Sequence, residues 1–433
     1  MNFKKDIKLN KFTNNTIWLI LEKVFQLFLG LFVGVWTARY LGPTNFGILN
    51  YGASLIAFFT VICSLGLENV IIKYFINDPK KSNTFLFSAI LMRLIVSLIS
   101  IVIIYIIVSA IHYNEQLIIT VITLQSLALI FQSFDTIDYW FQSKLMSKYV
   151  VLGKSIARLV VSIWKIYLLA SGASLEFFAL SSTIEAIVVS FVLGLFYFKL
   201  NNVKISFSKK HSKALLLDSY HFILSGLLVS LFTQIDKIMI ANLIGQSSVG
   251  VFSVAANIAV LWYFVPLAVI NSARPVILDN KKESNLKYED NLKKLYAFII
   301  WIGVFVSLVV TLLSYEIIHI LYGTQYLKAA APLAILTWSS VFSLLGSARN
   351  IWIVSENANK YTKYFFLMGI IVNFLLNYIF IGLFGIVGAA IATLMAQITT
   401  TIIAPLLFAK TKKSTQLMVC SVLLIGLIFK SKN

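Results

Sequence analysis

Long apolar stretches alternate with short polar connections along the whole chain. Each stretch is long enough for a helix that crosses the hydrocarbon core of a bilayer, which needs about 20 apolar residues. The pattern therefore predicts an all-α polytopic membrane protein with about twelve transmembrane helices, at residues 15–37, 46–70, 84–109, 117–141, 149–171, 175–198, 215–240, 249–273, 295–314, 329–353, 361–381 and 385–409. A last apolar stretch, Leu417 to Phe429, is either an interfacial or half-inserted segment or a shortened thirteenth span.

Basic residues gather on every second connection. If the N-terminus is cytoplasmic, the inside segments hold nearly all of the loop lysines, whereas the outside connections hold only Arg39 and Lys328. Cytoplasmic loops collect Lys and Arg, so both termini are predicted to be cytoplasmic. A missed helix would destroy this asymmetry, which therefore also supports the number of spans.

Composition excludes several classes of protein. Of the 433 residues, 59% are hydrophobic and only 12% are charged, whereas soluble domains carry about 25% charged residues. A cytosolic enzyme and a sizeable appended soluble domain are both excluded. The net charge of +19 lies in loops and forms no basic face outside the membrane, so nucleic-acid binding is also excluded. The basic N-terminus precedes an apolar run with no cleavage site and reads as a retained first helix.

The chain divides naturally after six spans. We expect an N-terminal bundle at 1–200, a basic cytoplasmic linker at 201–213, a C-terminal bundle at 214–410 and a tail at 411–433. A weak internal repeat supports this division, because the segment from Ala38 to Gly47 has a counterpart from Ala241 to Gly250, at the same place in the second half. Because six spans is an even number, the two halves enter the membrane from the same side, which predicts a pseudo-two-fold axis along the membrane normal.

The first of these segments also resembles a family motif. Thr37 to Gly47 is similar to the AR-x-LGP-x-x-[FY]G signature of Wzx-type polysaccharide flippases, in the superfamily that includes the MATE drug exporters and the lipid II flippase. The matching residues are Arg39, Gly42, Pro43 and Gly47. Further segments resemble family elements in the same order: Leu65 to Asn69 with Glu68, Gln234 to Lys237 leading to Gly245 and Gly250, Tyr322 to Tyr326 before Ala329, and Gly385 to Thr393.

The resemblance implies a MATE-like fold of two six-helix bundles around a cavity that opens alternately to either side of the bacterial inner membrane. It implies a flippase that moves a polyprenyl-diphosphate-linked oligosaccharide from the cytoplasmic to the outer leaflet, for O-antigen, capsule or exopolysaccharide synthesis. A proton or sodium ion as coupling ion, and the polysaccharide polymerase with its chain-length machinery, are candidate partners. The alternatives are a drug or cation antiporter, a lipid II flippase or an integral-membrane polymerase, although the polymerase would need a large external loop.

The fifth predicted span carries an unusual set of charges. Lys154, Arg158 and Lys165 are spaced by four and seven residues, so they share one face of a helix. Three cations cannot all face lipid, and we interpret them as a cavity wall that binds the anionic diphosphate. The alternative is that Lys154 extends to the cytoplasmic surface while the other two are neutralised by structural partners.

Other polar residues at membrane depth are also candidates. In span four, Gln132 and Asp135 share a polar face that could bind sugars or join helices, whereas Asp138 is interpreted as structural. Arg93 is a further candidate for substrate binding. Candidate ion-coupling residues are Glu22, for which an ion pair with a buried cation is the alternative, and Asp236 of the second-half motif. Arg349, near the end of its span, is expected at the surface. The motif residues Arg39 and Glu68 are expected to be structural, at tight turns.

No catalytic or metal-binding constellation is visible. The four histidines are scattered without ligand spacing, and the chain has no P-loop. We therefore expect no catalytic residue, no metal and no cofactor, and a secondary-type transporter instead of an enzyme.

Overall fold

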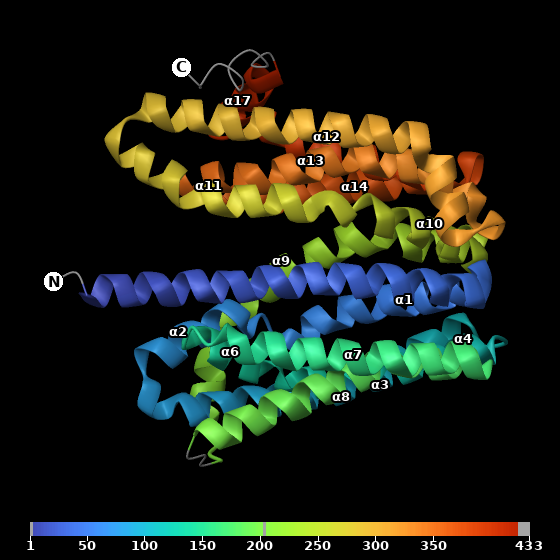
Figure 1. The fold of residues 1–433 in the computed structure, drawn as a ribbon, viewed down its shortest axis with the longest axis horizontal. Helices are drawn as coiled ribbons and strands as arrows, with labels where there is room; N and C mark the ends of the chain where they lie inside the picture. Colours follow the sequence, from blue (N-terminus) through green and yellow to red (C-terminus); the bar gives the residue numbers. More distant parts are fainter. Residues whose placement is uncertain (1–2, 202–204, 423–433) are drawn as a thin grey trace. The chain divides into compact units, whose positions relative to one another are not determined.

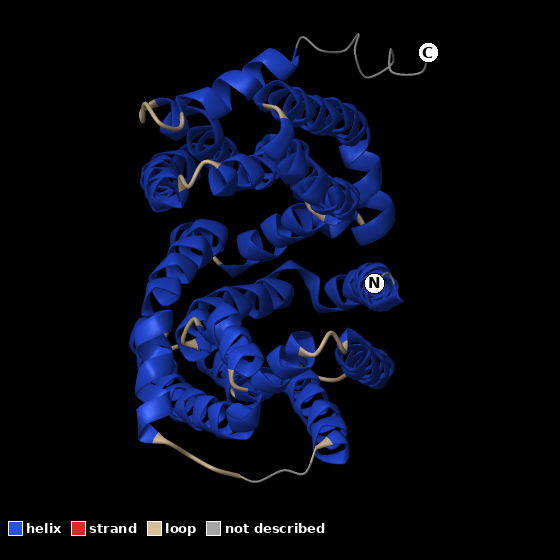
Figure 2. Cartoon of the chain, turned by 90° about the vertical axis from the view of Figure 1, so that its left-hand side faces the viewer, coloured by secondary structure: helices blue, strands red, loops and turns tan. Residues whose placement is uncertain are grey.

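The computed structural model describes residues 3–201 and 205–422, and these ranges contain helices and connections without a strand (Figure 1 and Figure 2). The predicted all-α fold is confirmed. The chain divides into two compact units, unit 1 at Met1–Ser230 and unit 2 at Leu231–Asn433, and the division falls inside α9 (Lys209–Ile244). The limits predicted from the sequence at residues 200, 213 and 410 stay predictions.

Unit 1 is built from the helices that precede the middle of α9. Apolar side chains of α2, α3, α6, α7 and α8 form its core. In chain order its elements are α1 (Phe3–Ser64), α2 (Leu67–Asn77), η1 (Pro79–Lys81), α3 (Ser82–Ile111), α4 (Gln116–Ser126), α5 (Ala128–Gln132), η2 (Ser133–Asp135), α6 (Thr136–Ser143), α7 (Ser147–Ser171), α8 (Leu175–Leu200) and the first part of α9.

Unit 2 contains the rest of α9 and all later helices. Its core joins α11, α12, α13, α14 and the short α17. The elements are α10 (Gln246–Ala259), η3 (Leu261–Tyr263), α11 (Phe264–Glu283), α12 (Asn285–Tyr322), η4 (Thr324–Ala329), α13 (Ala330–Ser355), α14 (Asn359–Phe384), α15 (Ile386–Ile398), the π-helix η5 (Thr399–Ile403), α16 (Ala404–Leu406) and α17 (Lys412–Val422). The predicted apolar tail, Leu417 to Phe429, lies partly outside the described residues.

Helix α1 is two helices joined at the first motif. At Gly42 the backbone has φ 70° and ψ 173°, and Pro43 follows. This combination is essentially restricted to glycine, so the chain turns sharply at that residue. In Figure 1 the ribbon of α1 runs away from the N-terminus and then turns back. The expected tight turn between the first two spans is therefore confirmed.

The counterpart motif in unit 2 makes the same turn. Gly245, between α9 and α10, has φ 87° and ψ 171°, close to the angles at Gly42. The following glycines of the two motifs, Gly47 and Gly250, are both buried. The sequence repeat therefore corresponds to a repeat of backbone geometry. Arg39 and Glu68 are exposed near helix ends.

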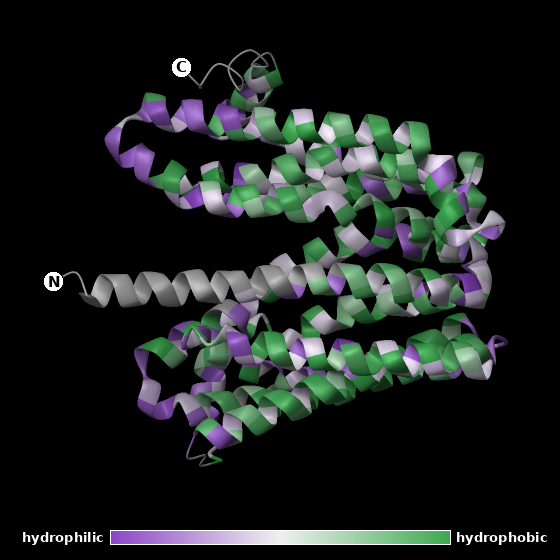
Figure 3. Cartoon of the chain, in the orientation of Figure 1, coloured by the Kyte–Doolittle hydropathy of each residue, from purple (hydrophilic) through white to green (hydrophobic). Residues whose placement is uncertain are grey.

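The structure has ten candidate membrane spans among its described residues, by length and hydropathy. The difference from the predicted number has two causes. The two halves of α1 are counted as one span, Phe28–Ser64, although Gly42 separates them. Helix α7 (Ser147–Ser171) is not counted, and it carries Lys148, Lys154, Arg158 and Lys165. In each unit, Figure 3 shows hydrophobic residues along most helices and hydrophilic residues at many connections.

The fourth predicted span, residues 117–141, corresponds to the candidate span Gln116–Ser143, which is not one continuous α-helix. It consists of α4, α5, the 3-10 turn η2 and α6. The polar residues of this segment compete for the backbone groups that a regular helix would use. Ser133 donates to the Leu129 carbonyl, and Thr136 donates to the Ser133 carbonyl.

Candidate functional site

A row of three basic residues lies in unit 1 on the predicted face of α7. It consists of Lys154, Arg158 and Lys165 and is called the polar row of α7. Arg158 lies about halfway along the helix, with Lys154 one turn before it and Lys165 two turns after it. All three side chains are partly exposed. Placing a charge in hydrocarbon costs about 3 kcal/mol or more, so the exposed parts of these side chains require contact with water.

Lys154 is held by a carboxylate. Its ammonium group lies 2.7 Å from Oδ2 of Asp138 on α6, and the side chain of Asp138 is 7% exposed. The other oxygen, Oδ1, accepts a hydrogen bond of 2.9 Å from Gln142. Asp138 is therefore structural, as expected, and Lys154 is neutralised by it instead of extending freely to the membrane surface.

Arg158 has looser partners. Its Nη2 lies 3.9 Å from Oε1 of Glu185 on α8, and the two side chains are 26% and 39% exposed. The amide of Gln26 on α1 also faces the guanidinium group; with its oxygen toward Arg158 it accepts from Nη2 at 2.9 Å and from Nη1 at 3.2 Å. The Nε of Arg158 is buried and has no hydrogen-bond partner among the described residues.

Lys165 continues the row without a direct partner. Among the described residues its ammonium group has no hydrogen bond and no ion pair, although Glu185 is close enough to interact with it electrostatically. Arg158 and Lys165 therefore share a single carboxylate. Two cations with one carboxylate between them form a site that can attract an anion.

The sequence analysis did not identify Asp138 and Glu185 as partners of the basic row. Asp138 and Lys154 lie at similar distances from the connection between α6 and α7, as do Arg158 and Glu185 from the turn at Gly172. Residues at equal distances from a tight turn face each other in an antiparallel helix pair. This positional symmetry is the signal that could have found both pairs.

Arg93, predicted to bind substrate, is 3% exposed and joins three elements of unit 1. Its Nε donates to the Cys63 carbonyl at 3.3 Å, Nη1 to the Thr136 hydroxyl at 3.0 Å and Nη2 to the Gln132 carbonyl at 2.7 Å. Withdrawing the Gln132 carbonyl from the helical ladder favours the break at η2. Arg93 thus positions the η2 segment, and its expected role in substrate binding stays a prediction.

The remaining candidates of unit 1 surround the same segment. The Gln132 amide oxygen accepts a weak hydrogen bond of 3.4 Å from Thr60. Asp135 is half-buried and has no hydrogen-bond or ion-pair partner among the described residues, although Arg93 and Lys154 interact with it electrostatically. Glu22 on α1 is buried and interacts electrostatically with Lys154. The carboxylates of Glu22 and Asp135 therefore lie near the same lysine.

Asp236 on α9 occupies a different kind of site, within unit 2. Its Oδ1 accepts hydrogen bonds from the side-chain amides of Asn373 at 2.9 Å and Asn377 at 2.6 Å, and its Oδ2 accepts from the Thr393 hydroxyl at 2.7 Å. Asp236 is 6% exposed. The amide oxygen of Asn377 is buried and has no partner among the described residues. Three neutral groups from α14 and α15 thus surround one buried carboxylate.

Arg349, expected at the surface, is 6% exposed and lies inside unit 2. Its Nη1 donates to the carbonyls of Thr400 at 3.1 Å and Thr401 at 2.7 Å, both in the π-helix η5. The guanidinium carbon lies 4.9 Å from the centre of the Phe365 ring. The expectation was wrong because the carbonyls of a π-helix, which the sequence pattern does not reveal, provide acceptors for a buried arginine.

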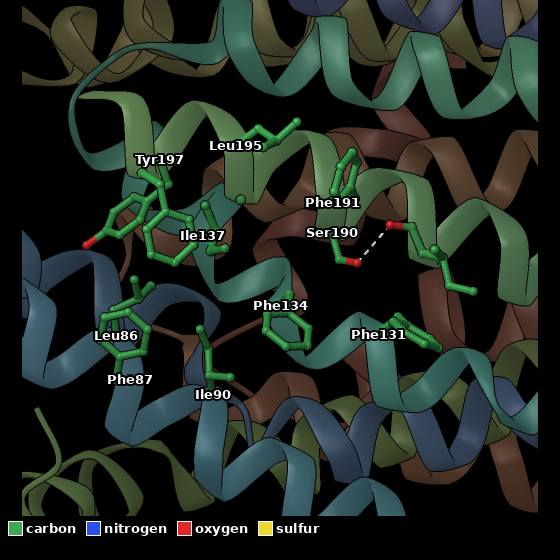
Figure 4. A pocket seen from close by; sticks show the side chains of 13 residues that line it. Leu86, Phe87, Ile90, Phe131, Phe134, Ile137, Ser190, Phe191, Leu195 and Tyr197 are labelled. Carbon is green, nitrogen blue, oxygen red and sulfur yellow. Dashed lines mark hydrogen bonds between the residues drawn. The ribbon is translucent and has the colours of Figure 1, made fainter. Parts of the chain in front are cut away.

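A pocket of about 390 Å³ lies between α3, α5, η2, α6 and α8 of unit 1 (Figure 4). Its lining is almost entirely apolar and includes Phe131, Phe134 and Phe191. Its two polar groups already have partners, because Ser190 donates to the Ile187 carbonyl and Tyr197 donates to Asn83. The pocket has no free polar group for a sugar or a phosphate, so the polar row of α7 is the better candidate site.

No group of three His, Cys, Asp or Glu residues that could hold a metal ion occurs in the part of the chain that the structure describes.

Comparison with known proteins identifies the family. The family model described as "Polysaccharide biosynthesis protein" matches residues 12–281, and the MatE model matches residues 222–379. The capsular polysaccharide biosynthesis protein CapF of Staphylococcus aureus is 24% identical over 82% of this chain and 88% of its own length. The probable flippase AglR of Haloferax volcanii is 29% identical over 40% of this chain, and the match spans 37% of AglR.

Solved structures share the fold. The lipid II flippase MurJ, in an inward closed conformation, has a TM-score of 0.68 at 16% identity, over 95% of this chain and 91% of MurJ. An inward-facing multidrug resistance MATE transporter has a TM-score of 0.69 at 16% identity, over 91% of this chain and 95% of the transporter. The chain therefore belongs to the polysaccharide biosynthesis protein family, and it is a polytopic all-α membrane protein with a MATE-like fold.

Proposed function

We propose that the protein is a flippase that moves polyprenyl-diphosphate-linked oligosaccharide repeat units from the cytoplasmic to the outer leaflet of the inner membrane, for O-antigen, capsule or exopolysaccharide synthesis. The observation that carries this proposal is the pair of partly exposed cations, Arg158 and Lys165, in the middle and C-terminal parts of α7, a helix long enough to cross a membrane. A diphosphate group is the anion that such a lipid-linked sugar brings to this depth. Charge-assisted hydrogen bonds to guanidinium and ammonium groups are the strong ones.

The names of the relatives support the same assignment. One is called a probable flippase and the other a capsular polysaccharide biosynthesis protein. The structural neighbours include inward- and outward-facing transporters, which supports alternating access as the mechanism. We infer the orientation from the basic inside loops, which place both termini in the cytoplasm.

The candidate site residues of unit 1 have different roles in the proposed mechanism. Arg158 and Lys165 bind the diphosphate, whereas Lys154, one turn before Arg158, is already neutralised by Asp138. Gln132 and Asp135 offer amide and carboxylate groups that can donate to or accept from sugar hydroxyls. Arg93 positions the segment that carries these two residues.

We further propose that Asp236 is the site of ion coupling. Its two carboxylate oxygens accept three hydrogen bonds from neutral donors of α14 and α15. A carboxylate with amide and hydroxyl oxygens nearby is the ligand set that hard cations prefer, and the unpartnered amide oxygen of Asn377 could rotate toward such an ion. We therefore favour sodium over a proton at this site. Glu22 remains a second candidate for coupling.

The proposal is tested in a strain from which the gene is deleted. Complete repeat units linked to lipid should accumulate in the cytoplasmic leaflet, and the wild-type gene should restore polymer at the cell surface. The double variant Arg158→Gln/Lys165→Gln should fail to restore it at equal protein level in the membrane. Lys148→Gln is the matched control, because Lys148 is an exposed lysine in the first turn of the same helix.

Other outcomes of the same experiment identify the alternatives. Incomplete repeat units would indicate an assembly enzyme, and complete units in the outer leaflet would indicate a polymerase. Unchanged intermediates would favour a drug exporter. Wild-type polymer with the double variant would exclude the α7 row as the diphosphate site.

A further inference from the structure

Two carboxylates form ion pairs with the basic row of α7, and they are held in different ways. Asp138 makes a short contact of 2.7 Å with Lys154, accepts a second hydrogen bond from Gln142 and is 7% exposed at its side chain. Glu185 comes no closer than 3.9 Å to Arg158 and is 39% exposed. One carboxylate is therefore fixed, whereas the other is only loosely attached.

The contact of Glu185 is too long for a hydrogen bond, since donor and acceptor atoms of charged pairs lie about 2.7–2.9 Å apart. The attraction between Glu185 and its neighbours is therefore Coulombic. Arg158 forms the ion pair, and Lys165 interacts with the same carboxylate electrostatically. Because Glu185 is half-exposed and has no short contact with either cation, it can move away without breaking a well-formed hydrogen bond.

Donors on both cations are left over. The Nε of Arg158 is buried without a partner, and the Lys165 ammonium has no hydrogen bond among the described residues. A buried donor without an acceptor is costly. A ligand with several anionic oxygens could satisfy both groups at once, which the single Glu185 carboxylate does not do in this geometry.

We propose that Glu185 is a resident counter-ion, which neutralises Arg158 and Lys165 in the absence of substrate and is displaced by the diphosphate group of the substrate. This inference rests on the proposed function. The displaced carboxylate competes with the diphosphate for the same two cations, so it lowers the net affinity. Lower affinity lets the lipid-linked sugar leave at the other leaflet instead of remaining bound, and Glu185 returns to the cations after release.

The test measures binding of inorganic pyrophosphate to the purified full-length protein by isothermal titration calorimetry. Glu185→Gln should bind pyrophosphate about tenfold more tightly than the wild type, because one competing charge is removed. Glu185→Asp keeps the charge and should resemble the wild type. Glu176→Gln is the matched control, since it makes the same change in the first turn of α8 and should leave the affinity unchanged.

The variant Arg158→Gln distinguishes a failure of the counter-ion role of Glu185 from a failure of the diphosphate site itself. If this variant loses pyrophosphate binding while Glu185→Gln equals the wild type, the counter-ion role is wrong and the diphosphate site stands. If Arg158→Gln binds as the wild type does, the site itself is wrong, and the counter-ion role fails with it. Tight binding by both Glu185→Asp and Glu185→Gln would show that side-chain shape, and not charge, controls the affinity, and would also overturn the role.

Discussion

The charged row of α7 in unit 1 and the sites of Asp236 and Arg349 in unit 2 hold their charges in opposite ways. Arg93 of unit 1 is held by neutral groups, as Arg349 is. In unit 1, charged side chains of α7 are paired with other charged side chains, and the members Arg158 and Glu185 remain partly exposed. In unit 2, buried charges are held by neutral groups: Asp236 by two amides and a hydroxyl, and Arg349 by two backbone carbonyls and a ring. A charged side chain that is paired with another movable charged side chain can exchange partners, whereas one that is held by fixed dipoles cannot.

This difference suggests a division of labour. The exchangeable charges of unit 1 suit a large anion that must bind and leave. The fixed dipoles of unit 2 suit either permanent structure, as at Arg349, or a small ion that fits among fixed ligands, as we propose for Asp236. The comparison predicts that substitutions in unit 2 cost more stability and that those in the row of unit 1 cost more transport.

The largest expected effect on stability is that of Arg349→Met. The substitution removes two charge-assisted hydrogen bonds to η5 and leaves the carbonyls of Thr400 and Thr401 without this donor, which should cost about 3 kcal/mol. Thermal unfolding of the purified protein in detergent measures this loss. Arg158→Met, the same change in the partly exposed row, should cost about 1 kcal/mol or less. Equal losses for the two variants would contradict the comparison.

The contrast between these two arginines also shows what the sequence could predict. Apolar windows of spanning length identify an all-α membrane fold, and the motif at Gly42 and Gly245 predicts two turns whose backbone angles agree. Such features are local, because they depend on residues close together in the chain. The stripe of α7 is local in the same sense, and its spacing alone placed Lys154, Arg158 and Lys165 on one face.

The partners of these charges were harder to predict, since they come from other helices. The break in the fourth span arises where Arg93 on α3 binds the carbonyl of Gln132, and no pattern within residues 117–141 indicates it. Arg349 was expected at the surface because it lies near the end of its span, and the π-helix whose carbonyls bind it leaves no signal in hydropathy. Helix α7, which is not among the ten candidate spans of the described residues, carries the charged row on which the proposed function rests.

Asp138→Asn should have the next largest effect on stability. It leaves Lys154 without its ion-pair partner beside a largely buried site and should cost about 2 kcal/mol. Because the cost comes from an uncompensated charge, the double variant Asp138→Asn/Lys154→Gln should recover much of it. Denaturation of the single and double variants completes a double-mutant cycle, and additive losses would show that the two side chains do not interact.

A smaller effect should appear on adding sodium. If unit 2 binds the ion at Asp236, sodium at ten times its dissociation constant should stabilise the wild type by about 1.4 kcal/mol relative to potassium. Asp236→Asn should abolish this difference, and Asp218→Asn, on the same helix but in unit 1, should retain it. Melting curves in matched chloride salts provide the measurement. Stabilisation by lower pH in place of sodium would indicate a proton at this site.

The smallest effect should follow Gly194→Leu. This substitution changes the apolar face of α8 and leaves the face that carries Glu185 intact. Gly194 lines the apolar pocket of unit 1, and a Cβ added there meets no atom within 4 Å. Because Gly194 and Glu185 are nine residues apart, they lie on opposite sides of the helix. Leucine should therefore fill apolar space without disturbing the charged row, with a change in stability within about 1 kcal/mol and wild-type polymer export. Lost export in a normally folded variant would assign the apolar face a part in transport, and the charged row could then no longer account for transport alone.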